Sequence, residues 1–263
     1  MSSGSPMRAI VLAGQRPGTA NPLAMRFGVA NKCLIPMQAR PLIEHVLATL
    51  GRHPRIGEIH VSTDADSAPA IAEAASRAGG NVKVKLVEAR DSLSTSIAAA
   101  AEGAAGPLLV TTGDHVLLAA AAIDSVAVTL ARADVVVAMT RRDAVVAAHP
   151  RGQLRFYEFS DGAYADCRLC GANGPDALKA LALLTDGGRQ LRDPSQIGNL
   201  LGMTDRLKLK VNALSLEAVV NKIGRKVGVE ATPVVLADGS QAFAIENDLT
   251  YGITEQLLTQ RPG

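Results

Sequence analysis

The fold is decided by the stretch Lys32-Cys-Leu-Ile-Pro-Met-Gln-Ala-Arg-Pro-Leu-Ile-Glu-His-Val-Leu47 and by the apolar run Met7-Arg-Ala-Ile-Val-Leu-Ala-Gly14 before it. The run predicts a short buried strand, and Gln15-Arg-Pro-Gly-Thr19 predicts a glycine-containing loop at its carboxyl end. In an open α/β sheet, ligands bind where strands end and helices begin, and backbone N–H groups there can hold phosphate. With one arginine in the loop and one lysine after it, this region suits a triphosphate.

Apolar runs alternate with helical patterns through the first half of the chain, which predicts βαβ units and a mainly parallel sheet. The predicted strands are 8–12, 58–62, 82–87, 107–112 and 135–139. The predicted helices between them are 41–50, 68–78, 94–103 and 119–131.

The pattern changes between residues 145 and 235. The predicted elements there are antiparallel strands at 145–150 and 155–159, a turn-rich loop at 167–175, helices at 176–184 and 213–223, and a strand at 227–232. The end of the chain is predicted to form an apolar strand from residue 243, which Glu246 follows directly. A final helix then runs to about residue 260. Repeats and linkers are absent from the sequence, so we expect residues 1–263 to form a single domain.

Composition argues against a nucleic-acid-binding protein. The 263 residues carry a net charge of only +2, with no Trp, three Tyr and four Phe, so neither a basic surface nor aromatic stacking is supported. An apolar content of 48% supplies ample material for a core. No stretch reaches the roughly 18 apolar residues of a membrane-spanning helix, and the polar segment 1–6 does not resemble a signal peptide.

The three cysteines indicate a reduced compartment, because an odd number argues against a secreted disulfide framework. We therefore expect a cytoplasmic protein. Cys167-Arg-Leu-Cys170 has the spacing of a redox or zinc pair, but the chain has no second pair and the nearest histidine is His149. A structural role for these two thiols is the favoured interpretation.

The N-terminal motifs resemble those of the nucleotidyltransferase superfamily with a glycosyltransferase-A-like fold, which includes the MobA-like NTP transferases. Its signature is a strand, then L-A-G-G with a nearby Arg, then K-x-x-x-P-x-x-x-x-P-L-I-x-x-x-L. The residues on this pattern are Leu12, Ala13, Gly14, Arg16, Gly18, Lys32, Pro36, Pro41, Leu42 and Ile43. Two departures are Gln15, where a second glycine is usual, and the long loop between Gly18 and Lys32. Gln15 fits if its φ is negative.

The resemblance implies an α/β fold, with a Rossmann-like, mixed and mainly parallel sheet flanked by helices, of the nucleotide-diphospho-sugar transferase type. It also implies that 145–235 is an acceptor-binding insertion within the domain.

Arg16 and Lys32 are the predicted catalytic residues. Nucleotidyl transfer places negative charge on the α-phosphate and on the departing pyrophosphate, and cations stabilise that charge. The alternative is that Arg16 is a solvated loop residue and Lys32 an exposed helix start.

Asp114 and Glu246 are the predicted ligands of Mg²⁺. Gly113-Asp-His-Val-Leu-Leu118 resembles the G-D-x-P-L-L segment, whose aspartate holds the metal, and Mg²⁺ suits carboxylate with phosphate oxygens. The alternative for Asp114 is a helix cap, and His115 is expected to shape the loop. For the second ligand we prefer Glu246 to Asp248, which could cap the final helix.

The nucleotide is expected to contact backbone groups at the first loop and a serine-containing turn after the third strand. The predicted nucleotide-binding residues are Leu12, Ala13, Gly14, Gln15, Gly18, Ser94, Ser96 and Asp64. The alternative for Ser94 is helix capping. For the acceptor we predict Arg168 and Asn173, since Gly171-Ala-Asn-Gly resembles a G-G-N turn; the alternative is a solvated cationic surface.

The function implied is a Mg²⁺-dependent nucleotidyltransferase that moves an NMP group from an NTP to a small phosphorylated acceptor and releases pyrophosphate. Two alternatives remain open. A glycosyltransferase using a nucleotide sugar usually carries D-x-D where this chain has Gly113-Asp-His115, and a nucleotide-sensing protein would keep the fold without turnover. The sequence selects neither the NTP nor the acceptor. It does not show the oligomeric state, although homodimers are common among similar proteins.

Overall fold

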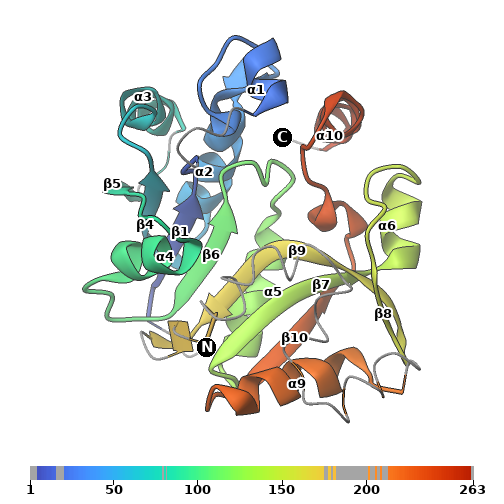
Figure 1. The fold of residues 1–263 in the computed structure, drawn as a ribbon. Helices are drawn as coiled ribbons and strands as arrows, with labels where there is room; N and C mark the ends of the chain where they lie inside the picture. Colours follow the sequence, from blue (N-terminus) through green and yellow to red (C-terminus); the bar gives the residue numbers. More distant parts are fainter. Residues whose placement is uncertain are drawn as a thin grey trace.

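One sheet organises the chain. The computed structural model describes residues 5–15, 21–78, 80, 82–174, 177, 178, 180, 181, 201, 205, 208 and 213–261. The sheet runs β10-β7-β9-β6-β1-β4-β5, with β8 paired to β9 (Figure 1). Its strands are β1 (Met7–Leu12), β4 (Ile56–Thr63), β5 (Lys83–Glu88), β6 (Leu108–Thr112), β7 (Val135–Arg141), β8 (Tyr157–Phe159), β9 (Gly162–Ala172) and β10 (Ala231–Leu236). Neighbouring strands are parallel except where β9 pairs with β6, β7 and β8.

Helices cover both faces of this sheet. They are α1 (Pro22–Arg26), α2 (Leu42–Arg52), α3 (Ala68–Arg77), α4 (Leu93–Ala101), α5 (Ala120–Leu130), α6 (Arg142–Ala148), α9 (Leu216–Lys226) and α10 (Asp248–Gln260), with 3-10 turns η1 (Lys32–Leu34) and η3 (Gly239–Ala242). A small hairpin of β2 (Pro36–Met37) and β3 (Arg40–Pro41) leads into α2. The mixed, mainly parallel sheet flanked by helices confirms the predicted fold class.

The alternation of β1 explains why its sequence is apolar throughout. Ala9 and Val11 belong to the core under α2, α3 and α5, whereas Ile10 belongs to the core under α4 and α9. A central parallel strand is buried on both faces and therefore reads as a continuous apolar run rather than an alternating one.

The five strands predicted for the first half and the four helices between them are present, with ends that differ by a few residues. The second half departs further. Residues 145–150, predicted as a strand, overlap α6, and the predicted loop 167–175 is largely the carboxyl half of β9. The predicted helix 213–223 is α9, and the strand predicted at 227–232 begins only at Ala231. Of the helix predicted at 176–184, residues 177, 178, 180 and 181 are helical and the others lie outside the described residues.

Gly171 explains why β9 resembled a loop in the sequence. A Cβ atom at this position would lie 2.6 Å from Leu130 Cδ1 and 2.7 Å from Val126 Cγ1 on α5. The glycine therefore allows close approach of a helix to the sheet and does not mark a turn. The range 145–235 thus supplies β8, β9 and β10 to the main sheet, and its role in acceptor binding stays a prediction.

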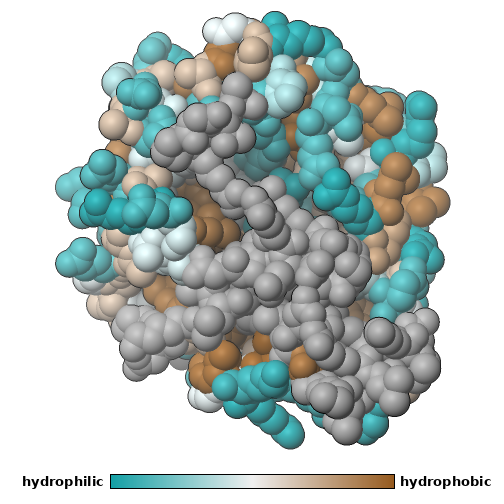
Figure 2. Space-filling model, viewed as in Figure 1, coloured by the Kyte–Doolittle hydropathy of each residue, from teal (hydrophilic) through white to brown (hydrophobic). Residues whose placement is uncertain are grey.

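The surface carries apolar side chains in separate small groups. Figure 2 shows hydrophobic groups interrupted by hydrophilic ones over the coloured part of the face that it presents. The large exposed apolar residues are Met25, Leu93, Val128, Val146, Leu154, Val235 and Leu249. None of the helices in the described ranges has the length and apolar character needed to cross a bilayer. The homodimer stays a prediction.

We predict that Gly171→Ala lowers the free energy of unfolding by about 1–3 kcal/mol, because the added methyl group overpacks the contact between β9 and α5. Urea denaturation measures this change. The matched control is Gly252→Ala, in a helix where an added Cβ meets nothing within 4 Å; we expect it to stabilise the protein by up to about 1 kcal/mol. Equal effects of the two substitutions would contradict the packing role of Gly171.

Candidate functional site

The carboxyl ends of four parallel strands meet at one edge of the sheet. Gly14 and Gln15 follow β1, Asp64 follows β4, Ala89 follows β5 and Asp114 follows β6. The segments that leave the strands pack closely here, since a Cβ on Gly14 would lie 2.8 Å from the Cβ of Ala89. This edge is where α/β proteins bind ligands, and most of the predicted site residues lie along it.

Asp114 is the centre of a charge cluster at this edge. Its side chain is only 7% exposed and forms ion pairs with Lys32 Nζ and with Arg168 Nη1, the latter at 3.2 Å. Burial alone would raise the pKa of Asp114, but the two neighbouring cations, Lys32 first, outweigh it and hold this pKa well below its usual range. Asp114 is therefore a permanent carboxylate, and it does not cap a helix: α5 begins six residues later after Ala119.

Lys32 is fixed by Asn31, a residue that the sequence analysis missed. The buried Asn31 caps η1 by accepting a hydrogen bond from Cys33 N at 2.8 Å, and its amide donates to the Ala13 carbonyl at 2.7 Å. Asn31 thus ties the lysine-bearing turn to the end of β1. An asparagine immediately before a helical start was the available signal.

Arg168 reaches the cluster from a β-bulge. β9 places Cys170 opposite Val137 and Asp166 opposite Met139, so three residues of β9 span one residue of β7. Arg168 is the middle one and has a φ of +51°, in the left-handed region that non-glycine residues rarely adopt. Bulges of this kind redirect a side chain next to functional sites. Here the result is a guanidinium that is 17% exposed and contacts two different acids.

Glu246, rather than Asp248, joins Asp114. Glu246 Oε1 lies 3.2 Å from Arg168 Nη2, and its Oε2 lies 3.5 Å from Arg155 Nη2. Asp248 instead pairs with Arg26, and the cap of α10 is Asn247, with Asp248 as the first helical residue. The alternative that Asp248 caps the final helix is therefore wrong. The segment before Glu246 is not a strand, since it connects η3 to α10.

A small apolar core lies next to three members of the cluster, Lys32, Asp114 and Glu246. It contains Ile35, three residues after Lys32, Val116, two residues after Asp114, and Ile245, which precedes Glu246. Tyr251 and Leu258 of α10 pack against the same core, and the Tyr251 hydroxyl donates to the Pro36 carbonyl at 2.6 Å. This packing brings the C-terminal segment to the site.

The predicted nucleotide-binding residues of the first loop have defined local roles. Ala13 N donates to the Ser62 carbonyl at 2.8 Å, and Leu12 accepts from Gly113 N at 2.9 Å, so both hold the end of β1 within the sheet. The left-handed non-glycine residues of the described chain are Gln38, Ala39 and Arg168, so Gln15 does not need the positive φ of a glycine. Arg16 and Gly18 lie outside the described residues.

Asp64 orders the loops around it. Its carboxylate accepts from Gln15 N at 3.2 Å, from Ser67 N at 2.8 Å and from Asn31 Nδ2 at 3.2 Å. Burial opposes the charge, yet these hydrogen bonds, Ser67 first, lower the pKa of Asp64. The structure therefore gives Asp64 a loop-positioning role, and direct contact with nucleotide stays a prediction.

Ser94 and Ser96 lie in the first turn of α4. The cap of this helix is Ser92, in a reciprocal capping box with Thr95, so the alternative that Ser94 caps the helix is wrong. The buried Ser96 hydroxyl accepts from Arg90 N at 2.8 Å and lies 2.8 Å from the Ser92 carbonyl, which fixes the turn 90–92. Base contact by either serine stays a prediction.

Asn173 is not part of the cluster. It follows the carboxyl end of β9, whose Ala172 pairs with Leu108 at the start of β6, whereas Asp114 follows the end of β6. Asn173 lies five residues after Arg168 along an extended strand, a distance of about 16 Å. Its side chain donates to the carbonyls of Leu130 at 2.6 Å and Ala133 at 2.9 Å. The prediction that Asn173 binds the acceptor is therefore corrected: its amide satisfies carbonyls at the end of α5.

The cysteines and His115 have structural roles. Cys167 and Cys170 pack into cores on opposite faces of the sheet, so the motif does not form a redox or zinc pair. Burial raises the pKa of the Cys33 thiol, which lies next to Lys32. Burial also lowers the pKa of His115 to about 4, and its Nδ1 lies 3.0 Å from Thr111 Oγ1. His115 is thus neutral and shapes the loop, as predicted.

The donors at the edge fit a magnesium ion bound together with a nucleotide. Among the described residues, no group of three or more His, Cys, Asp or Glu side chains is arranged to hold a metal. Mg²⁺ does not need such a cage, because it binds through one or two carboxylates, phosphate oxygens and water. Asp114 and Glu246 supply two carboxylates at the edge of the sheet where β1 ends.

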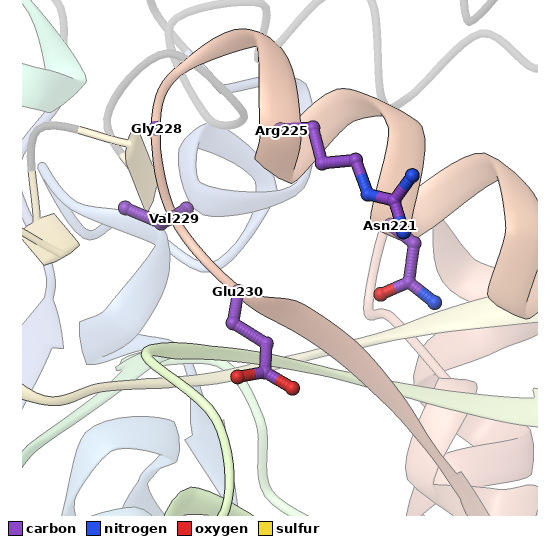
Figure 3. A pocket seen from close by; sticks show the side chains of 5 residues that line it. All are labelled: Asn221, Arg225, Gly228, Val229 and Glu230. Atoms are coloured by element: carbon purple, nitrogen blue, oxygen red, sulfur yellow. The ribbon is translucent and has the colours of Figure 1, made fainter.

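A cavity of about 490 Å³ lies at the opposite edge of the sheet, between α9 and the start of β10. It is lined by Asn221, Arg225, Gly228, Val229 and Glu230, with Arg225 and Asn221 close together on the helix (Figure 3). It contains none of the predicted site residues.

Comparison with known proteins decides the family. The sequence model described as "MobA-like NTP transferase domain" matches residues 9–196, more than two thirds of the chain. The chain belongs to the MobA-like NTP transferase family. The predicted resemblance and the prediction of a nucleotidyltransferase enzyme are thereby confirmed. No curated protein sequence matches closely enough to serve as a relative.

Solved structures agree with this family. A hypothetical transferase from Thermus thermophilus is 26% identical, with a TM-score of 0.72 over 94% of this chain and 99% of that one. A 4-diphosphocytidyl-2C-methyl-D-erythritol synthase from Anaerococcus prevotii has 13% identity and a TM-score of 0.59, over 98% and 100%. A CMP:2-keto-3-deoxy-manno-octonic acid synthetase in complex with CTP has 14% identity and a TM-score of 0.59, over 97% and 99%. The last two show likeness of fold alone.

We predict that Asp114→Asn lowers the free energy of unfolding at pH 7 by about 3 kcal/mol, because it removes the carboxylate paired with Lys32 and one of the two acids paired with the largely buried Arg168. The stabilisation by a carboxylate of lowered pKa is present above the unfolded-state pKa, about 3.9, and is lost as the pH falls towards the folded-state value. The difference between wild type and Asp114→Asn should therefore shrink below about pH 4. Urea denaturation at pH 7, 4 and 3 tests this, with the exposed Asp91→Asn as control. A difference that stays constant across this range would refute the ion-pair assignment.

Proposed function

We propose that this member of the MobA-like NTP transferase family is a Mg²⁺-dependent enzyme that transfers an NMP group to a small phosphorylated acceptor and releases pyrophosphate. The observation that supports this most strongly is the charge cluster of Lys32, Asp114, Arg168 and Glu246 at the carboxyl edge of the sheet. Two carboxylates and two cations at the edge where β1 ends would match the needs of phosphoryl chemistry.

The proposed reaction needs alignment and charge neutralisation rather than a general base. The attacking acceptor phosphate is already anionic near neutral pH, so its oxygen can attack the α-phosphorus directly, and pyrophosphate leaves with the electron pair of the broken P–O bond. Lys32 would stabilise charge on the α-phosphate, and Arg16 the departing pyrophosphate. Magnesium held by Asp114 and Glu246 would neutralise the triphosphate.

In the proposed complex, the nucleotide and the acceptor would bind to different parts of the sheet edge. The base and ribose would lie along the edge from Gly14 to Ser94 and Ser96, above β1, β4 and β5. The acceptor phosphate would lie on the β9 side, within reach of Arg168. The identity of the NTP stays open, because backbone groups make most of the expected base contacts. The three free cysteines support a reduced, cytoplasmic environment.

The decisive test is a panel of the four ribonucleoside triphosphates with phosphorylated sugars, polyols and pterins, read by pyrophosphate release with Mg²⁺ present. Lys32→Ala and Asp114→Ala should each reduce release by about 100-fold or more, the usual effect of removing one electrostatic stabiliser. Circular dichroism checks that both variants fold. Full turnover in both variants would exclude the proposed site.

The same assay separates the alternatives. A glycosyltransferase would release a free nucleoside diphosphate from a nucleotide sugar without pyrophosphate. A nucleotide-sensing protein would bind nucleotide, measured by calorimetry, without turnover of any acceptor in the panel.

The second carboxylate is tested by a matched pair of substitutions. Glu246→Gln should raise the Mg²⁺ concentration needed for half-maximal activity by at least about tenfold, as loss of a group around a metal does. Asp248→Asn, two residues away and paired with Arg26, should leave this requirement unchanged. A larger effect of Asp248→Asn than of Glu246→Gln would indicate that Asp248, rather than Glu246, is the second metal ligand.

A further inference from the structure

The guanidinium of Arg168 stands between the two carboxylates proposed to hold the metal. Nη1 lies 3.2 Å from Asp114 Oδ2, while Nη2 lies 3.2 Å from Glu246 Oε1. One cation thus bridges two acids that come from distant parts of the chain, one after β6 and the other before α10. The same Asp114 oxygen also pairs with Lys32.

A divalent ion and this guanidinium need the same oxygens. Guanidinium hydrogen bonds to carboxylates are close to 3 Å long, whereas Mg²⁺ binds oxygen at about 2.0–2.1 Å and demands near-octahedral geometry. A metal held by both acids would also bring a second positive charge against Arg168. The two cations therefore compete for one position.

We propose that Arg168 is the resident counter-ion of the metal-free site: it holds Asp114 and Glu246 in place and is displaced when the divalent ion binds. This inference rests on the proposed function, since it assumes that both acids are metal ligands. It differs from the acceptor role predicted for Arg168, although displacement would free the guanidinium for an acceptor phosphate.

The backbone at Arg168 suits such an exchange. The bulge is anchored on both sides, because Asp166 and Cys170 pair with β7 and Arg168 N donates to Asp166 Oδ1 at 3.2 Å. Only the flexible side chain beyond Cβ has to move. Arg155 does not offer the same bridge, since Glu246, at 3.5 Å, is the one acid that it pairs with among the described residues, and its side chain is 59% exposed.

Displacement makes a prediction that does not depend on activity. Removing the competing cation should tighten the binding of a divalent ion to the nucleotide-free protein, even though it removes contacts that stabilise the site. We expect Arg168→Gln to bind Mn²⁺ about tenfold more tightly than the wild type, within the usual range of coupling between two sites. Arg168→Lys, which keeps the charge and loses the two-pronged contact, should lie between them.

The experiment titrates the full-length protein with Mn²⁺ alone and measures free Mn²⁺ by electron paramagnetic resonance. The matched control is Arg155→Gln, which removes the same charge from the neighbourhood but does not bridge the acids; we expect a change of about twofold or less, as for exposed ion pairs. If Arg168→Gln does not fold, Arg168→Asn replaces it, because asparagine tolerates the left-handed conformation.

The outcomes separate this inference from the proposed function. Tighter Mn²⁺ binding by Arg168→Gln than by Arg155→Gln supports displacement. Measurable binding by the wild type that is equal or weaker in Arg168→Gln overturns the inference and leaves the proposed function intact. Equal tightening by Arg155→Gln also overturns it, because general charge would then explain the effect. Absence of Mn²⁺ binding in wild type and variants overturns the proposed metal site and the inference with it.

Discussion

Burial of the Asp114 carboxylate constrains the whole arrangement, because a charge removed from water must be paired to be tolerated. Its partners come from η1 and β9, which are far apart in the sequence, and η1 is in turn held to β1 by Asn31. Loss of either η1 or β9 would leave the buried carboxylate with one cation instead of two. The ion pairs therefore tie the position of Lys32 to the correct folding of the sheet.

The strand that delivers Arg168 shows how the sheet is adapted to this purpose. β9 lies antiparallel between β6 and β7, so it reaches the edge that carries the charge cluster in the middle of the sheet rather than at its side. A regular strand would direct successive side chains to the two faces, where both cores are apolar. The bulge places an arginine at the edge instead. The left-handed conformation costs roughly 1–2 kcal/mol, and the pairing of the guanidinium with two acids offsets that cost. Strain of this kind is typical of functional positions.

The sequence predicted the first half well because its strands are buried on both faces and its helices alternate with them, so each element has a strong local pattern. It predicted that Asp114 lies at the end of a strand, because an apolar run followed directly by Gly-Asp is a local pattern that marks where a buried strand ends. It did not predict β9, because a glycine in a turn and a glycine in a strand packed under a helix look alike in a sequence. Gly171 is of the second kind, since it packs under α5. It also missed Asn31, whose importance comes from the Ala13 carbonyl eighteen positions away. Asn173 was predicted to bind the acceptor because of its neighbours in the sequence. Its position depends instead on the direction of β9, which carries it to the edge of the sheet opposite Asp114.

Glu246 reaches the cluster by a different route from the other members. No strand carries it; Ile245, next to it, is fully buried in the apolar core that also contains Ile35 and Val116. That core is covered by α10 through Tyr251 and Leu258, so the last helix of the chain fixes the second acid by hydrophobic contact rather than by backbone pairing. Apolar contacts are less directional than hydrogen bonds. A carboxylate held in this way is 41% exposed, compared with 7% for Asp114, and it can adjust its position relative to a rigid partner. One fixed acid and one adjustable acid would suit the proposed site, which would have to accept a nucleotide-bound cation and later release it.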